Sequence, residues 1–317
     1  MKIKVYNQKY KKQILNLWNL TLNVDPLSEK RFYEKILLDD NFDPEYFLVS
    51  VKGGAVVGFI WSAVRNVPYG DLGLQEELGW IVAMCVGKEY QHQGIGTALV
   101  EEVQKKMLGR GVKTIILGAY APNYLFPGVD KENYPYARAF FEKNGYKQYS
   151  EAVSMKRSLF NFKKSNNYLC LEEKVKQKGY VLSSFELSDT EELLNFLHIH
   201  FPGDWAHNVK NAILKDNAYD TVLVLRDNKK EIVGYAQRAI DGNPDRFGPF
   251  GVKESHRGEG LGALLFNEML FDMFSKGIYH AYFLWTGGSA QKFYEKNGMA
   301  VYRNYDLMEK NLTQTLK

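Results

Sequence analysis

Cysteine is scarce in this sequence of 317 residues, which holds only Cys85 and Cys170. Neither stands in a CxxC or Cys/His cluster, so we expect no disulfide framework and no metal site. No apolar run approaches the length of about 18 residues that a transmembrane helix needs, and the N-terminal segment lacks the apolar core of a signal peptide. These absences favour a soluble, cytoplasmic protein with no membrane partner.

The sequence also lacks a strong excess of charge. It has 41 Lys and Arg against 37 Asp and Glu, a net charge of +4, and the basic residues are scattered. A nucleic-acid partner is therefore not expected. The composition, with 45% hydrophobic and 25% charged residues, is ordinary for a globular protein and excludes a collagen-like or disordered chain. The length predicts two domains.

An internal repeat divides the chain into two halves. Each half has the same order of strands and helices, which alternate as in an α/β protein. A polar segment without periodicity, residues 158–167, predicts a linker. We therefore expect one domain over 1–157 and a second over 168–317. The matching landmarks are Gly58 and Gly234, Gly94 and Gly260, Gly96 and Gly262, and the Glu-Lys-Asn-Gly runs at 142–145 and 295–298.

Local patterns predict the elements of each half. In the first, strands are expected over 47–51, 56–64 and 80–86, with a helix over 28–39 that Ser28 can cap. In the second, Asp189–His200 is expected as a helix with Asp189 as its cap. The last strand of that half is expected at 301–308.

A glycine pair follows a predicted buried strand in both halves and opens a long helix. Free backbone N–H groups and the positive end of the helix dipole would meet there, which suits an anion such as pyrophosphate. A P-loop is excluded because neither copy has the Lys-Ser/Thr end. The Rossmann pattern is met in form at Gly258, Gly260 and Ala263, but the first copy has His92 in place of the first glycine, and the acidic residue expected about 20 positions later is missing. Both copies instead share the pattern [Gln/Arg]-x-x-Gly-x-Gly, at 91–96 and 257–262.

This pattern, repeated twice and followed each time by a [Phe/Tyr]-Glu-Lys-x-Gly helix, resembles the GNAT superfamily of acyl-CoA-dependent N-acetyltransferases. The resemblance spans nearly the whole chain as a tandem pair. It implies two GNAT-like domains, each a mixed, mostly antiparallel, twisted sheet flanked by helices. It also implies that acetyl-CoA is a cosubstrate and that the protein is an N-acetyltransferase.

By the same resemblance, acetyl-CoA would bind through main-chain groups. The pantetheine would lie along a strand end like an added strand, and a backbone N–H there would polarise the thioester carbonyl. The residues implied in the first half are Met84, Cys85, Val86, Gln91, His92, Gln93, Gly94, Ile95, Gly96 and Thr97, and those in the second are Phe250, Gly251, Val252, Arg257, Gly258, Glu259, Gly260, Leu261, Gly262 and Ala263.

GNAT enzymes commonly use a tyrosine of the later helix to protonate the departing thiolate. The second half has Tyr294 at that position, whereas the first has Phe141, which cannot donate a proton. The resemblance therefore predicts that the C-terminal half is catalytic and the N-terminal half structural or substrate-shaping. An Asn common in the family is replaced by Gly287 in one half and Tyr136 in the other.

Two acidic residues and one long loop are candidates for acceptor binding. Asp241 and Asp245 lie in a loop where an acceptor amine could enter, to bind an ammonium or relay its proton; a purely turn-forming role is the alternative. The loop 121–136 is long, aromatic and acidic, which is typical of a binding element.

The tandem pattern is similar to glucosamine and glucosaminide N-acetyltransferases of bacterial cell-wall recycling, which implies a small amino-sugar acceptor. Related tandem families acetylate thiol-precursor amino sugars, antibiotics or polyamines, and protein lysine is a further candidate. A CoA-binding module without turnover is the alternative of another class. The sequence predicts no oligomeric state.

Overall fold

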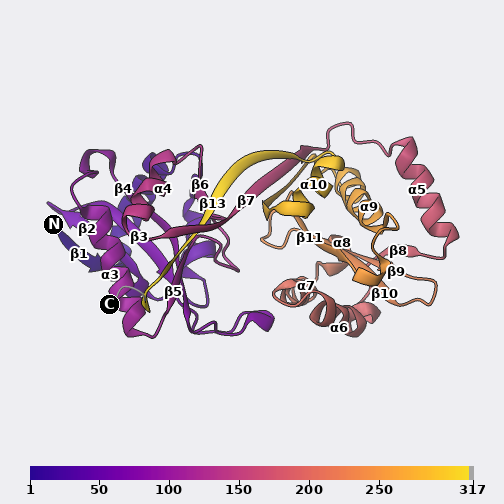
Figure 1. Ribbon diagram of the computed structural model, residues 1–317, viewed down its shortest axis with the longest axis horizontal. Coiled ribbons are helices and arrows are strands. Elements are labelled where there is room, and N and C mark those ends of the chain that lie inside the picture. Colours follow the sequence, from indigo (N-terminus) through magenta and orange to yellow (C-terminus); the bar gives the residue numbers. More distant parts are fainter. Residues whose placement is uncertain (314–317) are drawn as a thin grey trace. The chain divides into compact units, whose positions relative to one another are not determined.

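The computed structural model describes residues 1–313 and contains two compact units (Figure 1). Unit 1 comprises residues 1–68, 73–153 and the described chain from Arg303 onward, and unit 2 comprises 69–72 and 154–302. Within the described range, no helix combines the length and apolar character needed to cross a bilayer. The predicted fold class, a mixed and mostly antiparallel sheet flanked by helices in each domain, is confirmed.

Unit 1 is built on a sheet in the order β1-β2-β3-β4-β5-β13, with β6 also paired to β13. All of these pairs are antiparallel except β4 with β5, which is parallel. Its elements are β1 (Lys2–Val5), α1 (Lys11–Thr21), α2 (Glu29–Phe32), β2 (Phe47–Lys52), β3 (Ala55–Ala63), β4 (Leu78–Val86), α3 (Ile95–Gly109), β5 (Thr114–Leu117), β6 (Val129–Asp130) and α4 (Pro135–Lys143), with parts of β7 (Lys147–Ser158) and β13 (Ala300–Asn311).

The strands β4 and β5 separate part-way along their length. They pair from Leu78 with Thr114 to Ile81 with Leu117, and the Gly118 N–H donates to the Ile81 carbonyl at 2.9 Å. A register shift opposite Trp61 then leaves Val82 as an extra residue in β4. Such a bulge bends its strand away from the neighbour. The last residues of β4 consequently run on beside β3 alone.

Two apolar clusters cover the two faces of the unit 1 sheet. On one face, Trp18 of α1 stacks on Phe59 of β3 with ring centroids 5.6 Å apart. On the other, α3 packs Leu99 and Val103 against the sheet, and both side chains are fully buried. Burying one such apolar side chain stabilises the fold by roughly 1.5–3 kcal/mol. The two apolar layers therefore hold the separated strands in place.

Unit 2 repeats the arrangement with a four-stranded antiparallel sheet in the order β11-β10-β9-β8. Arg246, which directly precedes β11, forms an isolated parallel bridge with Tyr282 of β12. Its elements are α5 (Asn166–Gln177), β8 (Val181–Ser184), α6 (Thr190–His200), α7 (Trp205–Leu214), α8 (Ala218–Thr221), β9 (Val222–Arg226), β10 (Ile232–Arg238), β11 (Phe247–Val252), α9 (Leu261–Ser275), β12 (His280–Thr286) and α10 (Gly288–Lys296).

The division between the units differs from the repeat in the sequence. The strand expected to complete the second half is β13, yet from Arg303 onward it belongs to unit 1, where it pairs with β5 (yellow in Figure 1). In return, β7 from Ser154 onward belongs to unit 2, where the Ser154 hydroxyl donates to the Leu284 carbonyl at 2.6 Å. The alternation of apolar residues predicts a strand but cannot show which sheet it joins.

Local signals at helix starts had mixed outcomes. Ser28 caps α2 as predicted, accepting from the Arg31 N–H at 3.2 Å, although the α-helix ends at Phe32 and continues as a π turn. Asp189 precedes α6, but its side chain accepts from the Glu186 N–H in the turn before. The helix α5 was not predicted; it begins at Asn166, at the end of the expected linker, with Ser165 as its cap.

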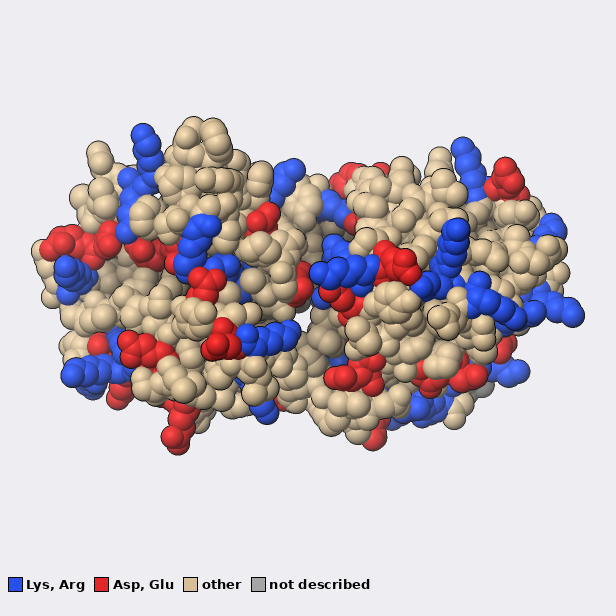
Figure 2. All heavy atoms as spheres, turned by 180° about the vertical axis from the view of Figure 1, so that it is seen from behind, with Lys and Arg blue, Asp and Glu red and all other residues tan. Residues whose placement is uncertain are grey.

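Charged side chains of both signs cover the surface of each unit. On the face that Figure 2 shows, Lys and Arg side chains lie among those of Asp and Glu. Many of them stand close enough to form ion pairs, such as Lys11 with Glu29 at 2.5 Å and Lys178 with Glu259 at 2.7 Å. This mixture of signs agrees with the small net charge of +4.

Candidate functional site

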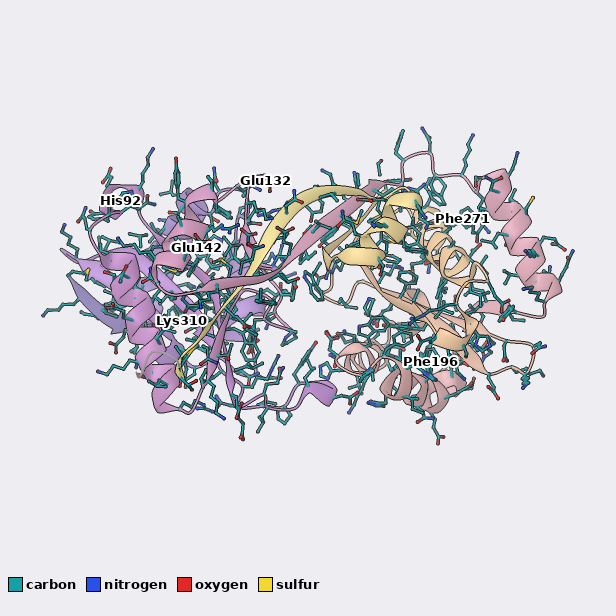
Figure 3. All side chains as sticks on the ribbon, viewed as in Figure 1. His92, Glu132, Glu142, Phe196, Phe271 and Lys310 are labelled. Atoms are coloured by element: carbon teal, nitrogen blue, oxygen red, sulfur yellow. The ribbon has the colours of Figure 1, made fainter. Side chains whose placement is uncertain are left out.

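A cavity of about 960 Å³ lies in unit 1 where β4 and β5 separate. Its wall includes both the glycine loop before α3, where Figure 3 labels His92, and the loop 121–136 that the sequence marked as a binding element. The lining residues are Thr21, Leu22, 81–86, 90–92, 94–97, Leu117, Gly118, Phe126, 128–130, 133–137, 139–141 and Lys143.

The glycine loop of unit 1 leaves an open cradle at the start of α3. Gly94 has φ +77°, a conformation that favours glycine, and a Cβ added to it would meet no atom within 4 Å. Gly96 permits close approach of Phe140, because a Cβ at this glycine would lie only 3.0 Å from the Phe140 ring. The helix N-terminus and its unpaired N–H groups therefore face open space, which suits a phosphate.

The free edge of β4 offers main-chain groups to the same cavity. The Gly87 N–H donates to the Val57 carbonyl of β3 at 2.9 Å, while the Val86 carbonyl points the other way and accepts from Gln91 Nε2 at 3.1 Å. Because peptide groups alternate along a strand, Met84 and Val86 direct their N–H and C=O groups to the cavity side. This is the strand end at which the pantetheine was expected from the sequence.

A network of charged groups forms the polar wall of the cavity. Asp25 accepts from Arg303 at 2.5 and 2.8 Å and from the Tyr134 hydroxyl at 2.7 Å. Arg303 also donates to Asp130 at 2.5 Å, and Asp130 accepts the N–H groups of Glu132 and Asn133. Asp130 and Tyr134 line the cavity, and Arg303 comes from β13.

The network fixes the charges of its members. Burial, aided by the neighbouring Asp25, raises the pKa of Tyr134, so its phenol stays protonated. Burial alone would raise the pKa of Asp130, but hydrogen bonds from Asn133 and Arg303 lower it. Burial opposes the charge on Arg303 as well, yet the hydrogen bond to Asp25 raises its pKa.

A second cluster on β13 supports the cavity loop from outside. Asp306 is 1% exposed and accepts from Arg138 of α4 at 3.1 Å and pairs with Lys131 at 3.2 Å. Arg138 also pairs with Glu142, which Figure 3 labels on α4. The last strand therefore ties down both ends of the segment 130–138, which carries much of the cavity wall.

In unit 2, the matching glycine loop is covered. Gly260 has φ +86°, but a Cβ added there would lie 2.6 Å from Leu171 of α5. Glu259 of the loop pairs with Lys178 at 2.7 Å. The helix α5 is held against α9 by Tyr168, whose hydroxyl bonds to Glu268. An apolar side chain thus covers Gly260, whereas the equivalent Gly94 of unit 1 is open.

The gap beside β11 in unit 2 is filled by aromatic rings. The ring of Tyr294 lies 4.4 Å from that of Phe283 and 5.8 Å from that of Phe250. Phe250 corresponds to Met84 of unit 1, and Phe266 corresponds to Val100. Unit 2 therefore has the larger side chain at both positions. Burial raises the pKa of Tyr294, and its hydroxyl has no hydrogen-bond partner among residues 1–313.

The other face of β11 is also closed. A Cβ at Gly251 would lie 2.5 Å from Phe201 and 3.0 Å from Trp205, whose rings stack with centroids 4.6 Å apart. The main-chain pattern of the strand is nonetheless kept, since Arg257 Nε donates to the Val252 carbonyl at 3.2 Å as Gln91 does in unit 1. Unit 2 therefore keeps the main-chain pattern of the site with larger side chains beside it, and Phe250 and Tyr294 stay partly exposed.

The predicted site residues therefore separate into two groups. Those of 84–86 and 91–97 border one cavity, apart from Gln93, whose Nε2 donates to the Glu89 carbonyl at 3.0 Å. Those of 250–263 surround a covered loop, and the assignment of the chemistry to Tyr294 stays a prediction. Asp241 and Asp245 shape a turn: Asp241 accepts the Asn243 N–H, and the Asp245 carbonyl accepts the Tyr282 N–H, each at 3.0 Å.

Sequence reasoning missed Asp25, Tyr134 and Arg303 as a group. Tyr134 lies in the loop that was marked as a binding element, so its composition gave a usable signal. Arg303 lies in the strand that the sequence assigned to the second half. The residues next to it do not indicate that it pairs with Asp25, 278 positions earlier.

Comparison with known proteins identifies the family. The model of the acetyltransferase (GNAT) family matches residues 12–146, and that of the acetyltransferase (GNAT) domain matches 218–298. The chain is a tandem GNAT acetyltransferase. The separated strands and the glycine loop of unit 1 are accordingly parts of a GNAT domain, and the predicted enzyme class is confirmed.

Two curated relatives carry acetyltransferase names. The chain is 32% identical over 108 residues to a mycothiol acetyltransferase of Streptomyces bingchenggensis, a match that covers 34% of this chain and 29% of that protein. It is 30% identical over 121 residues to the acetyltransferase plu1384 of Photorhabdus laumondii, covering 37% of this chain and 73% of that one.

Solved structures share the tandem fold across the whole chain. The glucosamine N-acetyltransferase region of a fungal multi-domain GH3 β-N-acetylglucosaminidase has a TM-score of 0.82 at 19% identity, covering 97% of this chain and 38% of that one. A tandem GNAT protein from the clavulanic acid biosynthesis pathway has a TM-score of 0.64 at 15% identity, covering 98% of both chains. At these identities the likeness concerns the fold alone.

Proposed function

We propose that this tandem GNAT enzyme transfers an acetyl group from acetyl-CoA to the primary amine of a small polar acceptor, and that the reaction takes place in the cavity of unit 1. The observation that carries the proposal is the continuity of that cavity. It joins the open glycine loop at Gly94 to the free edge of β4 and to the polar wall around Tyr134.

The residues of unit 1 suit each part of the donor. The N–H groups at the start of α3 would hold the pyrophosphate without a dedicated cation. The main-chain groups of Met84 and Val86 would hold the pantetheine as an added strand, and an N–H of this edge would stabilise the oxyanion of the tetrahedral intermediate. In the reaction the amine nitrogen bonds to the acetyl carbon, the carbon–sulfur bond breaks, and the proton from nitrogen ends on sulfur.

Around the glycine loop of unit 2, the described residues leave the donor less room. Leu171 covers Gly260, and Glu259 of the same loop is paired with Lys178 of the turn after α5. We therefore propose one molecule of acetyl-CoA per chain and a structural role for unit 2, in place of the assignment of catalysis to Tyr294.

An amino sugar such as glucosamine is the acceptor class that we propose. Three aromatic residues and one carboxylate of the loop 121–136 line the cavity, namely Phe126, Tyr134, Tyr136 and Asp130, and such walls stack on sugar C–H faces and attract an ammonium group. The likeness in fold to a glucosamine N-acetyltransferase region supports this choice. Polyamines, aminoglycosides and protein lysine are the competing acceptors.

The test is a turnover assay with the full chain. CoA release from acetyl-CoA is followed with glucosamine, spermidine, an aminoglycoside and a lysine-containing peptide, and products are identified by mass. We expect acetylated glucosamine as the preferred product. Preference for another amine would overturn the acceptor, and saturable CoA binding without turnover of any amine would favour a CoA-binding module.

A further inference from the structure

The hydroxyl of Tyr134 has its proton committed to one partner. It lies 2.7 Å from Asp25 Oδ2. The Asp25 carboxylate also accepts two hydrogen bonds from the Arg303 guanidinium, at 2.5 and 2.8 Å. A phenol next to a carboxylate must donate to it. The remaining lone pairs of the Tyr134 oxygen can then only accept hydrogen bonds.

Tyr134 is also the member of this network that reaches the cavity together with Asp130. Asp130 is 1% exposed and already accepts from Arg303 and from two backbone N–H groups. Its acceptor capacity is largely used inside the wall. Of the two residues of the network that line the cavity, Tyr134 is therefore the one whose oxygen accepts no hydrogen bond from the described residues.

The charge of the network favours a cation. Two carboxylates, Asp25 and Asp130, share one guanidinium, that of Arg303, which leaves one negative charge in the wall. The adjoining pairs do not cancel it, because Arg138 and Lys131 are each matched by Asp306 and by a glutamate. A buried excess of negative charge raises the local attraction for an ammonium group.

From this geometry we propose that Tyr134 is the residue that binds the acceptor amine in unit 1, with Asp25 and Arg303 as the residues that position it. The proposal rests on the proposed function, because it places the amine in the same cavity as the acetyl donor. It makes the enzyme selective for hydrogen-bond donors that carry positive charge. It also makes the site of unit 1 depend on a residue from the last strand of the chain.

The test compares two tyrosine variants in the full chain. Tyr134→Phe removes the acceptor oxygen. Tyr120→Phe is the matched control, because its hydroxyl also donates to a buried carboxylate of unit 1, Asp39, at 2.8 Å, and Tyr120 does not line the cavity. Glucosamine, spermidine and a lysine peptide are first compared, and the amine with the highest kcat/KM is chosen. KM is then measured for acetyl-CoA and for that amine.

We expect Tyr134→Phe to raise the KM of the amine about tenfold, which corresponds to the roughly 1.4 kcal/mol of one hydrogen bond to a charged group. The KM of acetyl-CoA should stay within about twofold of the wild-type value, as should both constants of Tyr120→Phe. An unchanged amine KM in a folded Tyr134→Phe variant overturns the proposal.

Arg303→Lys provides a second variant, since it keeps the charge but loses the paired contact to Asp25. We expect it to raise the amine KM while CoA binding, measured by calorimetry, is kept. If the wild-type chain acetylates none of the amines, the proposed function fails. If it acetylates one and neither variant affects the amine KM, only the assignment of Tyr134 fails.

Discussion

Replacing Tyr294 with phenylalanine separates the two halves as sites of chemistry. The Tyr294 ring lies among those of Phe247, Phe250, Phe266, Phe283 and Phe293, with centroids 4.4–6.3 Å away. Its hydroxyl has no hydrogen-bond partner in the part of the chain that the structure describes. The substitution therefore removes no bond and should change the free energy of unfolding by no more than about 1 kcal/mol.

The effect on catalysis differs sharply between the two assignments. A general acid contributes about 10²–10⁴-fold to the rate, so a catalytic Tyr294 predicts a loss of that size in the phenylalanine variant. With the reaction in unit 1, we expect kcat/KM within about twofold of wild type. The assay is CoA release at saturating acetyl-CoA, with a thermal melt to show that the variant is folded. A hundredfold loss in a folded variant would refute the placement in unit 1.

Two further predictions concern the last strand and the polar wall. Met308 of β13 is fully buried in the core of unit 1, so Met308→Ala should lower the free energy of unfolding by about 2–5 kcal/mol in a denaturant titration; a loss below about 0.5 kcal/mol would show that the strand does not belong there. Asp130 has a lowered pKa in the folded state, so its stabilising contribution is present above the unfolded value of about 4 and is lost as the pH falls through the folded pKa. Asp130→Asn should therefore lower the melting temperature at pH 7 and much less near pH 3; an equal loss at both values would contradict the ionic role of Asp130.

The sequence could predict the framework because its signals are local. Gly94 and Gly260 both start a long helix in the left-handed conformation, and the strands before them were found from their apolar runs. The Ser28 cap needs only the next turn of chain. Each of these features depends on neighbours within a few residues, which a pattern can show.

The sequence could not predict how open each glycine loop and its neighbouring strand are, because this depends on contacts between segments far apart in the chain. Leu171 reaches Gly260 from a helix 89 positions earlier, and no motif links the two. Likewise, Tyr294 matches the family position of a general acid, but its motif cannot show that the rings of Phe250 and Phe266 lie 5.8 and 5.7 Å from it. A retained motif therefore shows descent of the fold better than it shows where the ligand binds.

Calorimetric titration of CoA into the wild-type chain and two glycine variants tests the central claim most directly. Gly94→Val and Gly260→Val both impose left-handed strain, about 1–2 kcal/mol each, and Gly260→Val also displaces the Leu171 side chain, so a thermal melt of each variant shows that it is folded. We predict one CoA per wild-type chain, binding weakened at least tenfold by Gly94→Val, and binding unchanged by Gly260→Val. Two bound CoA molecules, or binding lost in the Gly260 variant and kept in the Gly94 variant, would contradict the account.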